Sequence, residues 1–446
     1  MTPPTERPPA PSFAEALRFW LKLGFISFGG PAGQIAVMHQ ELVERRRWIS
    51  ERRFLHALNY CMVLPGPEAQ QLATYIGWLL HRSWGGIVAG GLFVLPSLAI
   101  LIALSWIYLA FGHTPLVAGL FYGIKPAVTA IVLHAAHRIG SRALRNAWLW
   151  AIAAAAFVAI FAFAVPFPLI VLAAAVLGAV GARVAPQRFA AGGHAAARTR
   201  HGVAVIDDDT PTPAHARHRW PRFARVAAVG LALWAAPLAA LAAWLGWHGT
   251  LAQMGWFFTK AALLTFGGAY AVLPYVYQGA VDHHGWLGAA QMIDGLALGE
   301  TTPGPLIMVV AFVGFVGGWQ QAVFGPEALP AAGIVAACVA TWFTFLPSFV
   351  FILLGGPLVE STHRDLRFTA PLTAITAAVV GVILNLALFF ALHVLWPQGR
   401  DGAFDLTAAL IALAAALALF RFRSGVIEVL AACAVLGLAV TLFSAP

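Results

Sequence analysis

The sequence predicts an all-α polytopic membrane protein built from two inverted-topology repeats. Three observations lead to this fold class: an apolar composition, a series of long apolar runs, and an internal sequence repeat. Of the 446 residues, 60% are hydrophobic and only 10% are charged. This composition excludes an ordinary soluble domain, in which about a quarter of the residues are charged.

Apolar runs of roughly membrane-spanning length recur along the chain. The clearest lie at 86–107, 149–165, 227–247, 334–354, 373–395, 406–420 and 426–443. The bilayer core offers backbone groups no water, so these runs are predicted to cross as helices. Residues 1–12 are rich in proline and lack the regions of a cleavable signal, so we expect a disordered tail there.

A basic linker at 183–225 separates two apolar halves. It carries eight Arg, four His and the acidic run 207–209, so we expect a flexible cytoplasmic segment. The net charge of +9 is located mostly in such loops. The charge therefore indicates membrane topology and not a nucleic-acid partner.

The two halves repeat each other. The stretch "FWLKLGFISFGG" at 19–30 matches "FFTKAALLTFGG" at 257–268, and "LPGP" at 64–67 matches "TPGP" at 302–305. Both matches keep one offset, 238, without a gap, which indicates a tandem duplication. We assign the repeats to 13–182 and 251–446, with one extra spanning helix at 226–250.

The loops between the paired motifs predict that the repeats are inverted. The loop "HQELVERRRWISERR" carries five Arg, whereas its counterpart "YQGAVDHHGWLGAAQ" carries no Lys or Arg. Basic loops stay cytoplasmic, so the two loops should lie on opposite sides of the membrane. The N-terminus and the linker are then cytoplasmic and the C-terminus periplasmic. Inverted repeats are typical of secondary transporters.

Each repeat contains two breaks in apolar sequence, one at Gly-Gly and one at Pro-Gly-Pro. We interpret them as the tips of two re-entrant helical hairpins per repeat, followed by about four spanning helices. The alternative is a kink in a full spanning helix. Irregular backbone at membrane depth survives only inside protein or along a wet cavity, so the four breaks predict one shared cavity.

Helices that start after the breaks would present free N–H groups and a positive dipole end, which together favour an anion. Glycine would allow the anion to approach the backbone closely. The predicted substrate-binding residues at the breaks are Phe28, Gly29, Gly30, Pro31, Gln34, Pro65, Gly66, Pro67, Glu68, Gly267, Gly268, Thr301, Thr302, Pro303, Gly304 and Pro305.

Five charged residues in apolar sequence add to this prediction. Lys22 and Lys260 occupy equivalent positions before the Gly-Gly breaks and are predicted to bind substrate, or else to snorkel to the interface. Lys125 is expected to be an interfacial anchor. Glu68 and Glu300 are candidates for proton coupling, because a carboxylate in the membrane is costly. Glu68 could instead cap the helix that it starts.

No catalytic, metal or cofactor motif stands out, so we do not expect an enzyme. The sequence has no GKS/T phosphate loop and no HExxH, and its three cysteines lie far apart.

The stretch "FGGPAGQIAVMHQELVERRRWISERRFLHALNYCMVLPGPEAQQLATYIGWLLH" at 28–81, with "TFGGAYAVLPYV" and "TTPGPL", resembles the chromate transporter family in its long, two-domain form. The resemblance implies secondary active export of chromate across the bacterial inner membrane, chromate resistance, proton coupling, and sulfate as a competing analogue. "FGGA" replaces "FGGP" in the second half, so the two hairpins are not expected to bind alike.

Alternatives to this function are a transporter or channel for another small dianion such as sulfate, and a membrane-embedded chromate reductase. The lack of redox motifs disfavours the reductase. Both a monomer and a homodimer are compatible with the sequence.

Overall fold

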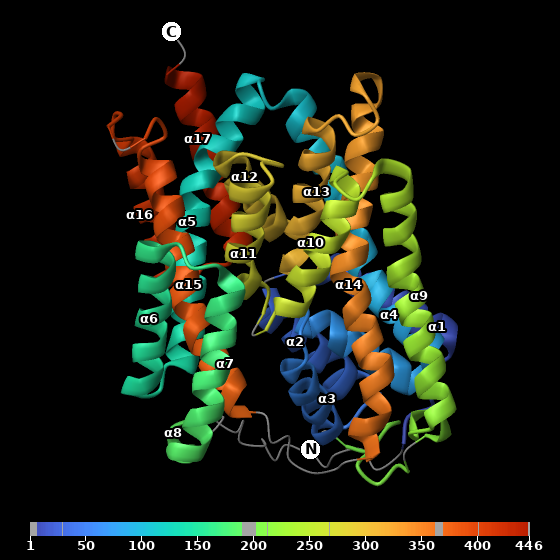
Figure 1. Ribbon diagram of the computed structural model, residues 1–446. Coiled ribbons are helices and arrows are strands. Elements are labelled where there is room, and N and C mark those ends of the chain that lie inside the picture. Colours follow the sequence, from blue (N-terminus) through green and yellow to red (C-terminus); the bar gives the residue numbers. More distant parts are fainter. Residues whose placement is uncertain are drawn as a thin grey trace.

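The computed structural model describes residues 7–28, 30–189, 202–211, 213–266, 268–361, 369–399 and 401–444. In these ranges the regular structure is helical, apart from one β-bridge between Ile49 and Ile206. Seven of the described helices are long and apolar enough to cross a membrane. The prediction of an all-α polytopic membrane protein is confirmed (Figure 1).

The first half consists of seven helices and one π-helical segment. They are α1 (Phe13–Ile26), α2 (Gly30–His39), η1 (Gln40–Arg45), α3 (Glu51–Val63), α4 (Glu68–Phe111), α5 (Pro115–Ala143), α6 (Ala147–Phe163) and α7 (Phe167–Val184). The long helix α4 is interrupted at His81 and Arg82, where Arg82 has φ 56°, so it behaves as two helices joined by a turn.

Local sequence explains where several of these helices begin. Ser12 and Ser50 precede α1 and α3, and each hydroxyl oxygen accepts a hydrogen bond from an N–H in the first turn. Asn146 does the same for α6. Such caps satisfy donors that the helix itself cannot pair.

The second half repeats this order of elements. It contains α10 (Thr250–Leu264), α11 (Ala269–Tyr277), η3 (Gln278–His283), α12 (Ala289–Thr301), η4 (Leu306–Met308), α13 (Val309–Gln320), η5 (Pro326–Ala328), α14 (Leu329–Ser361), α15 (Thr369–Leu395), α16 (Leu406–Phe420) and α17 (Val426–Ser444). The π-helical segments η1 and η3 begin and end 238 residues apart, as do α3 and α12. The structure therefore repeats at the offset seen in the sequence.

The hairpin helices are too short to cross a bilayer. At 1.5 Å per residue, the 14 residues of α1 span about 21 Å, against about 30 Å of hydrocarbon. In Figure 1, α2 and α3 lie in the lower part of the molecule, whereas α11 and α12 lie in the upper part. The two sets of hairpins therefore approach the middle of the molecule from opposite ends.

The spanning helices of the two halves interlock. Helices α16 and α17 pack against α5, and α6 and α7 pack against α15. The last two helices of each half therefore pack against a spanning helix of the other half. Between α5 and α17, a Cβ on Gly123 would lie 1.9 Å from the carbonyl oxygen of Cys433. Such close backbone contact through small residues is typical of membrane helix pairs.

The linker contains α8 (Pro186–Phe189) and η2 (Ala214–Ala216), and α9 (Trp220–Leu245) follows it. Helix α9 begins before the predicted residue 226. We expected a flexible linker, but residues 202–211 have fixed partners, because Ile206 N–H donates to Trp48 O and Ser50 N–H donates to Ile206 O. Linker residues 190–201 and Thr212 lie outside the described ranges.

Candidate functional site

The four predicted breaks lie between helices, and each contains a glycine with positive φ. The angles are 68° at Gly30, 127° at Gly66, 100° at Gly268 and 102° at Gly304. Other residues rarely adopt this backbone conformation, which explains the glycines. The neighbouring Gly29 and Gly267, also predicted to bind substrate, lie outside the described residues.

The tips of the hairpins are joined crosswise between the halves. Gly66 N–H donates to Thr265 O at 2.7 Å, and Gly304 N–H donates to Ser27 O at 2.8 Å. Gly66 and Gly304 are equivalent in the repeat, and so are Ser27 and Thr265. The second break thus binds the third, and the fourth binds the first.

Each Pro-Gly-Pro break also packs against a spanning helix of the opposite half. A Cβ on Gly66 would lie 2.2 Å from Ser348 Oγ in α14, and one on Gly304 would lie 2.9 Å from Ser97 Cβ in α4. Both serines belong to the matching "LPS" triplets. The four breaks therefore meet at one junction, and at its two Pro-Gly-Pro breaks a side chain larger than glycine has no room.

Glutamine side chains surround this junction. Gln34 Nε2, in α2, donates to Gly304 O and to Ser27 O, and Gln71 Nε2 donates to Pro65 O at 2.8 Å. The Oε1 atoms of Gln34, Gln70 and Gln71 are buried without a partner among the described residues. The junction is thus polar, although it lies among apolar helices.

A charged cluster borders the junction. An added Cβ on Gly30 would lie 3.9 Å from Arg138 Nη2, so this guanidinium lies beside the start of α2. Tyr270 OH, in the first turn of α11, donates to the Glu300 carboxylate near the end of α12. Arg138 interacts electrostatically with both Tyr270 and Glu300. One cation and one carboxylate thus share the region between the first and fourth breaks.

The other polar residues predicted at the breaks are less free to bind a ligand. Thr301 Oγ1 donates to Leu298 O, and Thr302 Oγ1 donates to Gly299 O, so both hydroxyl protons are used within α12. Glu68 is partly buried in the first turn of α4 and lies near Cys61. This position fits the capping alternative for Glu68.

The remaining predicted residues of the breaks fall where the sequence placed them. Phe28 and Pro31 flank the first break, Pro65 and Pro67 the second, and Pro303 and Pro305 the fourth. They shape the backbone of the junction.

The two predicted lysines lie away from the junction. Lys22 is exposed on α1. Lys260 is exposed on α10, with its ammonium 5.8 Å from the centre of the Trp256 ring, and lines a cavity of about 960 Å³ with His284. Burial and the nearby charges of His283 and Lys260 lower the pKa of His284 to about 4, so His284 adds no charge to this cavity at neutral pH. Both lysines fit the snorkelling alternative.

Several charged contacts are not apparent in the sequence. Lys125, expected as an interfacial anchor, has its Nζ 3.4 Å from Asp294 Oδ2 in α12. In the sequence, Arg138 looks like one of the loop arginines that set membrane topology. Its position beside Gly30 becomes apparent only in the fold. Of these residues, only Tyr270 could have been noticed in the sequence as a site candidate, because it directly follows the start of the helix after "FGGA".

Comparison with known proteins agrees with this architecture. The family model described as "Chromate transporter" matches residues 14–179 and 252–438, one match in each half. A chromate transport protein of Pseudomonas aeruginosa is 35% identical over 382 residues, which cover 84% of this chain and 80% of that protein.

Two further relatives match over a longer range. The chromate transport protein of Cupriavidus metallidurans is 29% identical over 93% of this chain and 90% of its own length. A probable chromate transport protein of Synechococcus elongatus is 30% identical, covering 93% of this chain and 91% of the relative. No solved structure matches the chain. The family matches, one in each half, show that the chain belongs to the chromate transporter family.

Proposed function

We propose that this protein is a secondary active exporter of chromate across the bacterial inner membrane, and that it confers chromate resistance. The relatives named as chromate transport proteins support the substrate. The observation that carries the proposal is the Arg138 guanidinium beside the start of α2 at Gly30.

Chromate is a tetrahedral dianion, and this site suits its charge and shape. A guanidinium offers parallel N–H donors to two oxygens of one anion. The first N–H groups of α2 lack partners within the helix and add a positive dipole end. Gly30 has no side chain, so an oxygen can approach the backbone closely. Sulfate has the same charge and shape, so we expect it to compete.

Glu300 is the proposed link to protons. When Glu300 is ionised, its negative charge and that of the substrate are both attracted to the Arg138 guanidinium, so the carboxylate weakens the attraction of Arg138 for the substrate. Protonation removes that competition, and Tyr270 then holds the neutral carboxyl. Substrate binding is therefore expected to strengthen as the pH falls.

The membrane potential supplies a driving force in the export direction. One charge that crosses 100 mV changes its free energy by about 2.3 kcal/mol, so a dianion that leaves alone gains about 4.6 kcal/mol and one that leaves together with the proton of Glu300 gains about 2.3 kcal/mol. With a potential that is negative inside, this force drives chromate outward.

The two halves are proposed to be inverted repeats that move against each other around the junction. The reciprocal bonds Gly66–Thr265 and Gly304–Ser27 support a two-fold relation between them. Hairpins that enter from opposite ends of the molecule support inversion (Figure 1). Such a pair can expose one central site to each side in turn.

The test is uptake of labelled chromate into everted membrane vesicles, with and without a pH gradient and with sulfate as competitor. Wild-type vesicles should accumulate chromate, and Arg138→Ala should lose most of the uptake. Arg142→Ala is the matched control, because Arg142 is exposed one turn farther along the same helix. Equal uptake by the Arg138 and Arg142 variants would refute the proposed binding site at Arg138. Flux that only follows the gradient, without proton movement, would indicate a channel.

A further inference from the structure

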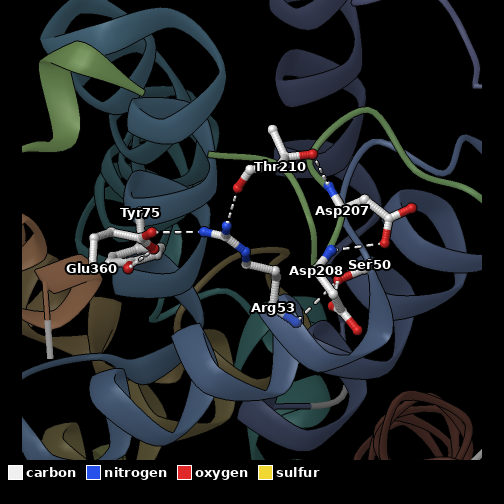
Figure 2. A network of polar contacts seen from close by, with 7 residues as sticks. All are labelled: Ser50, Arg53, Tyr75, Asp207, Asp208, Thr210 and Glu360. Carbon is white, nitrogen blue, oxygen red and sulfur yellow. Dashed lines mark hydrogen bonds and ion pairs between the residues drawn. The ribbon is translucent and has the colours of Figure 1, made fainter. Parts of the chain in front are cut away.

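A buried ion pair joins α3 of the first half to α14 of the second (Figure 2). Arg53 Nη1 lies 2.7 Å from Glu360 Oε2, and Tyr75 OH donates to Glu360 Oε1 at 2.6 Å. The side chain of Glu360 is 1% exposed and that of Arg53 is 11% exposed. We name Arg53, Glu360 and Tyr75 the lower clasp.

The linker holds the arginine of the lower clasp from its other side. Arg53 Nη2 donates to Thr210 O at 2.6 Å, and Ser50 Oγ donates to Asp208 Oδ1 at 2.6 Å (Figure 2). Both contacts fasten residues 208–210 to the start of α3. The linker therefore braces the end of the hairpin that carries Arg53.

A second ion pair, between a half-buried lysine and a buried aspartate, joins α12 of the second half to α4 and α5 of the first. Lys125 Nζ lies 3.4 Å from Asp294 Oδ2, and Tyr108 OH donates to the same oxygen at 2.8 Å. The side chain of Asp294 is 2% exposed, and its Oδ1 has no partner among the described residues. We name Lys125, Asp294 and Tyr108 the upper clasp.

The two clasps lie towards opposite ends of the molecule. Helices α3 and α12 are equivalent in the repeat, and each is tied to a helix of the other half by an ion pair whose carboxylate also accepts a hydrogen bond from a tyrosine, although the residues of the two clasps are not repeat equivalents. In Figure 1, α3 lies low and α12 lies high, on either side of the junction of the breaks. Each clasp therefore closes the space between the halves on its own side of the junction.

We propose that the two clasps are the gates of transport: the lower clasp opens when the junction faces the side of the linker, and the upper clasp opens when it faces the other side. This inference rests on the proposed function. Ion pairs suit this task because a buried pair gains little net stability over its hydrated, separated partners. Water that enters on one side can therefore take the place of the pair at low cost.

Native Cys61 provides a reporter for the lower gate. It lies in α3, two turns beyond Arg53 towards the break at Gly66, and is fully buried. A membrane-impermeant maleimide should reach it from the linker side only when the lower clasp is open. Labelling is measured at the Cys61 peptide by mass spectrometry, in everted and right-side-out vesicles.

The two gates should shift the labelling of Cys61 in opposite directions. Glu360→Gln weakens the lower clasp and should raise the labelling rate about tenfold, the ratio that corresponds to one lost charged hydrogen bond. Asp294→Asn weakens the upper clasp, favours the opposite state, and should lower the rate by a similar factor. Tyr75→Phe and Tyr108→Phe are milder variants with the same expected directions, should a carboxylate variant fail to fold.

Asp405→Asn is the matched control, because the Asp405 carboxylate also accepts from a tyrosine, Tyr122 at 2.9 Å, but belongs to neither clasp. It should leave the labelling rate unchanged. A rise in both gate variants would indicate merely structural contacts and overturn the proposal, and so would no change in either. Chromate uptake by the wild type, measured in the same vesicles, separates this outcome from failure of the proposed function.

Discussion

Replacing Gly66 by alanine tests the junction of the breaks most directly. Gly66 has φ 127°, a conformation that costs a residue with a side chain about 1–3 kcal/mol. The new Cβ would lie 2.2 Å from Ser348 Oγ and 2.6 Å from Gln71 Nε2, and overpacking of this kind costs about 1–3 kcal/mol more. Gly66→Ala should therefore destabilise the folded protein by about 2–6 kcal/mol.

The two contributions can be separated with a second substitution. Ser348→Ala removes the clashing Oγ but leaves Gln71 Nε2, so the double variant should regain the share of the overpacking cost that is due to Ser348 and keep the part due to φ. At the equivalent break, Gly304→Ala would meet Ser97 Cβ at 2.9 Å. Ser97→Ala keeps that Cβ and should rescue Gly304→Ala much less.

The measurements are thermal unfolding in detergent, followed by fluorescence-detected size exclusion, and chromate uptake in vesicles. Two results would refute the reasoning. One is wild-type stability for Gly66→Ala. The other is equal rescue of the two glycine variants by their serine partners.

Three further predictions concern charge. Arg138→Lys keeps the charge but loses the paired donors, so the KM for chromate uptake should rise about tenfold; an unchanged KM would argue against direct binding. Above the pH at which chromate itself takes up a proton, wild-type affinity should rise as the pH falls, and Glu300→Gln should abolish that rise; equal pH profiles would exclude Glu300 as the coupling group. Burial, with the charges of Arg222 and Arg82, lowers the pKa of His215 in the linker, although its bond to Trp78 O opposes the shift. The neutral ring is therefore favoured by folding, and its contribution, present above pH 6.5, is lost as the pH falls through the lowered pKa. Limited trypsin cleavage after Arg217 or Arg219, divided at each pH by the cleavage rate of an unfolded control peptide, should accelerate at pH 5 relative to pH 7.5, and His215→Gln should abolish that difference; equal normalised rates at both pH values in the wild type would contradict it.

The positions of the breaks could be predicted because glycine and proline act locally. Positive φ at Gly66 and Gly304 follows from residue chemistry within each triplet. The hydrogen bonds between opposite tips could not be predicted, because only the packing of the two halves brings Gly66 and Thr265 together. Arg138 was missed for the same reason, since more than 100 residues separate it from Gly30.

The lysines show that charge in apolar sequence does not by itself predict which face of a helix carries it. In α1 the buried residues form a helical stripe that faces the protein: Ala16, Phe19, Trp20, Leu23 and Gly24. Lys22 falls on the opposite face, next to exposed Leu21 and Phe25. The periodicity of the helix was therefore a better guide to its orientation than the repetition of the lysine in both halves.

The duplication made the frame symmetric, but the charges at the junction are not. The repeat equivalent of Glu300 is Met62, and that of Tyr270 is Ala32. The four breaks are alike in backbone, whereas the charged cluster is not symmetric: Arg138 lies beside the first break, Glu300 precedes the fourth, and Tyr270 follows the third. A dianion attracted to Arg138 would therefore bind beside Gly30 at the start of α2, whereas no described atom lies within 4 Å of a Cβ added to Gly268. This predicts one binding site per chain and greater sensitivity to change at Gly30 than at Gly268, although both glycines have the same backbone role.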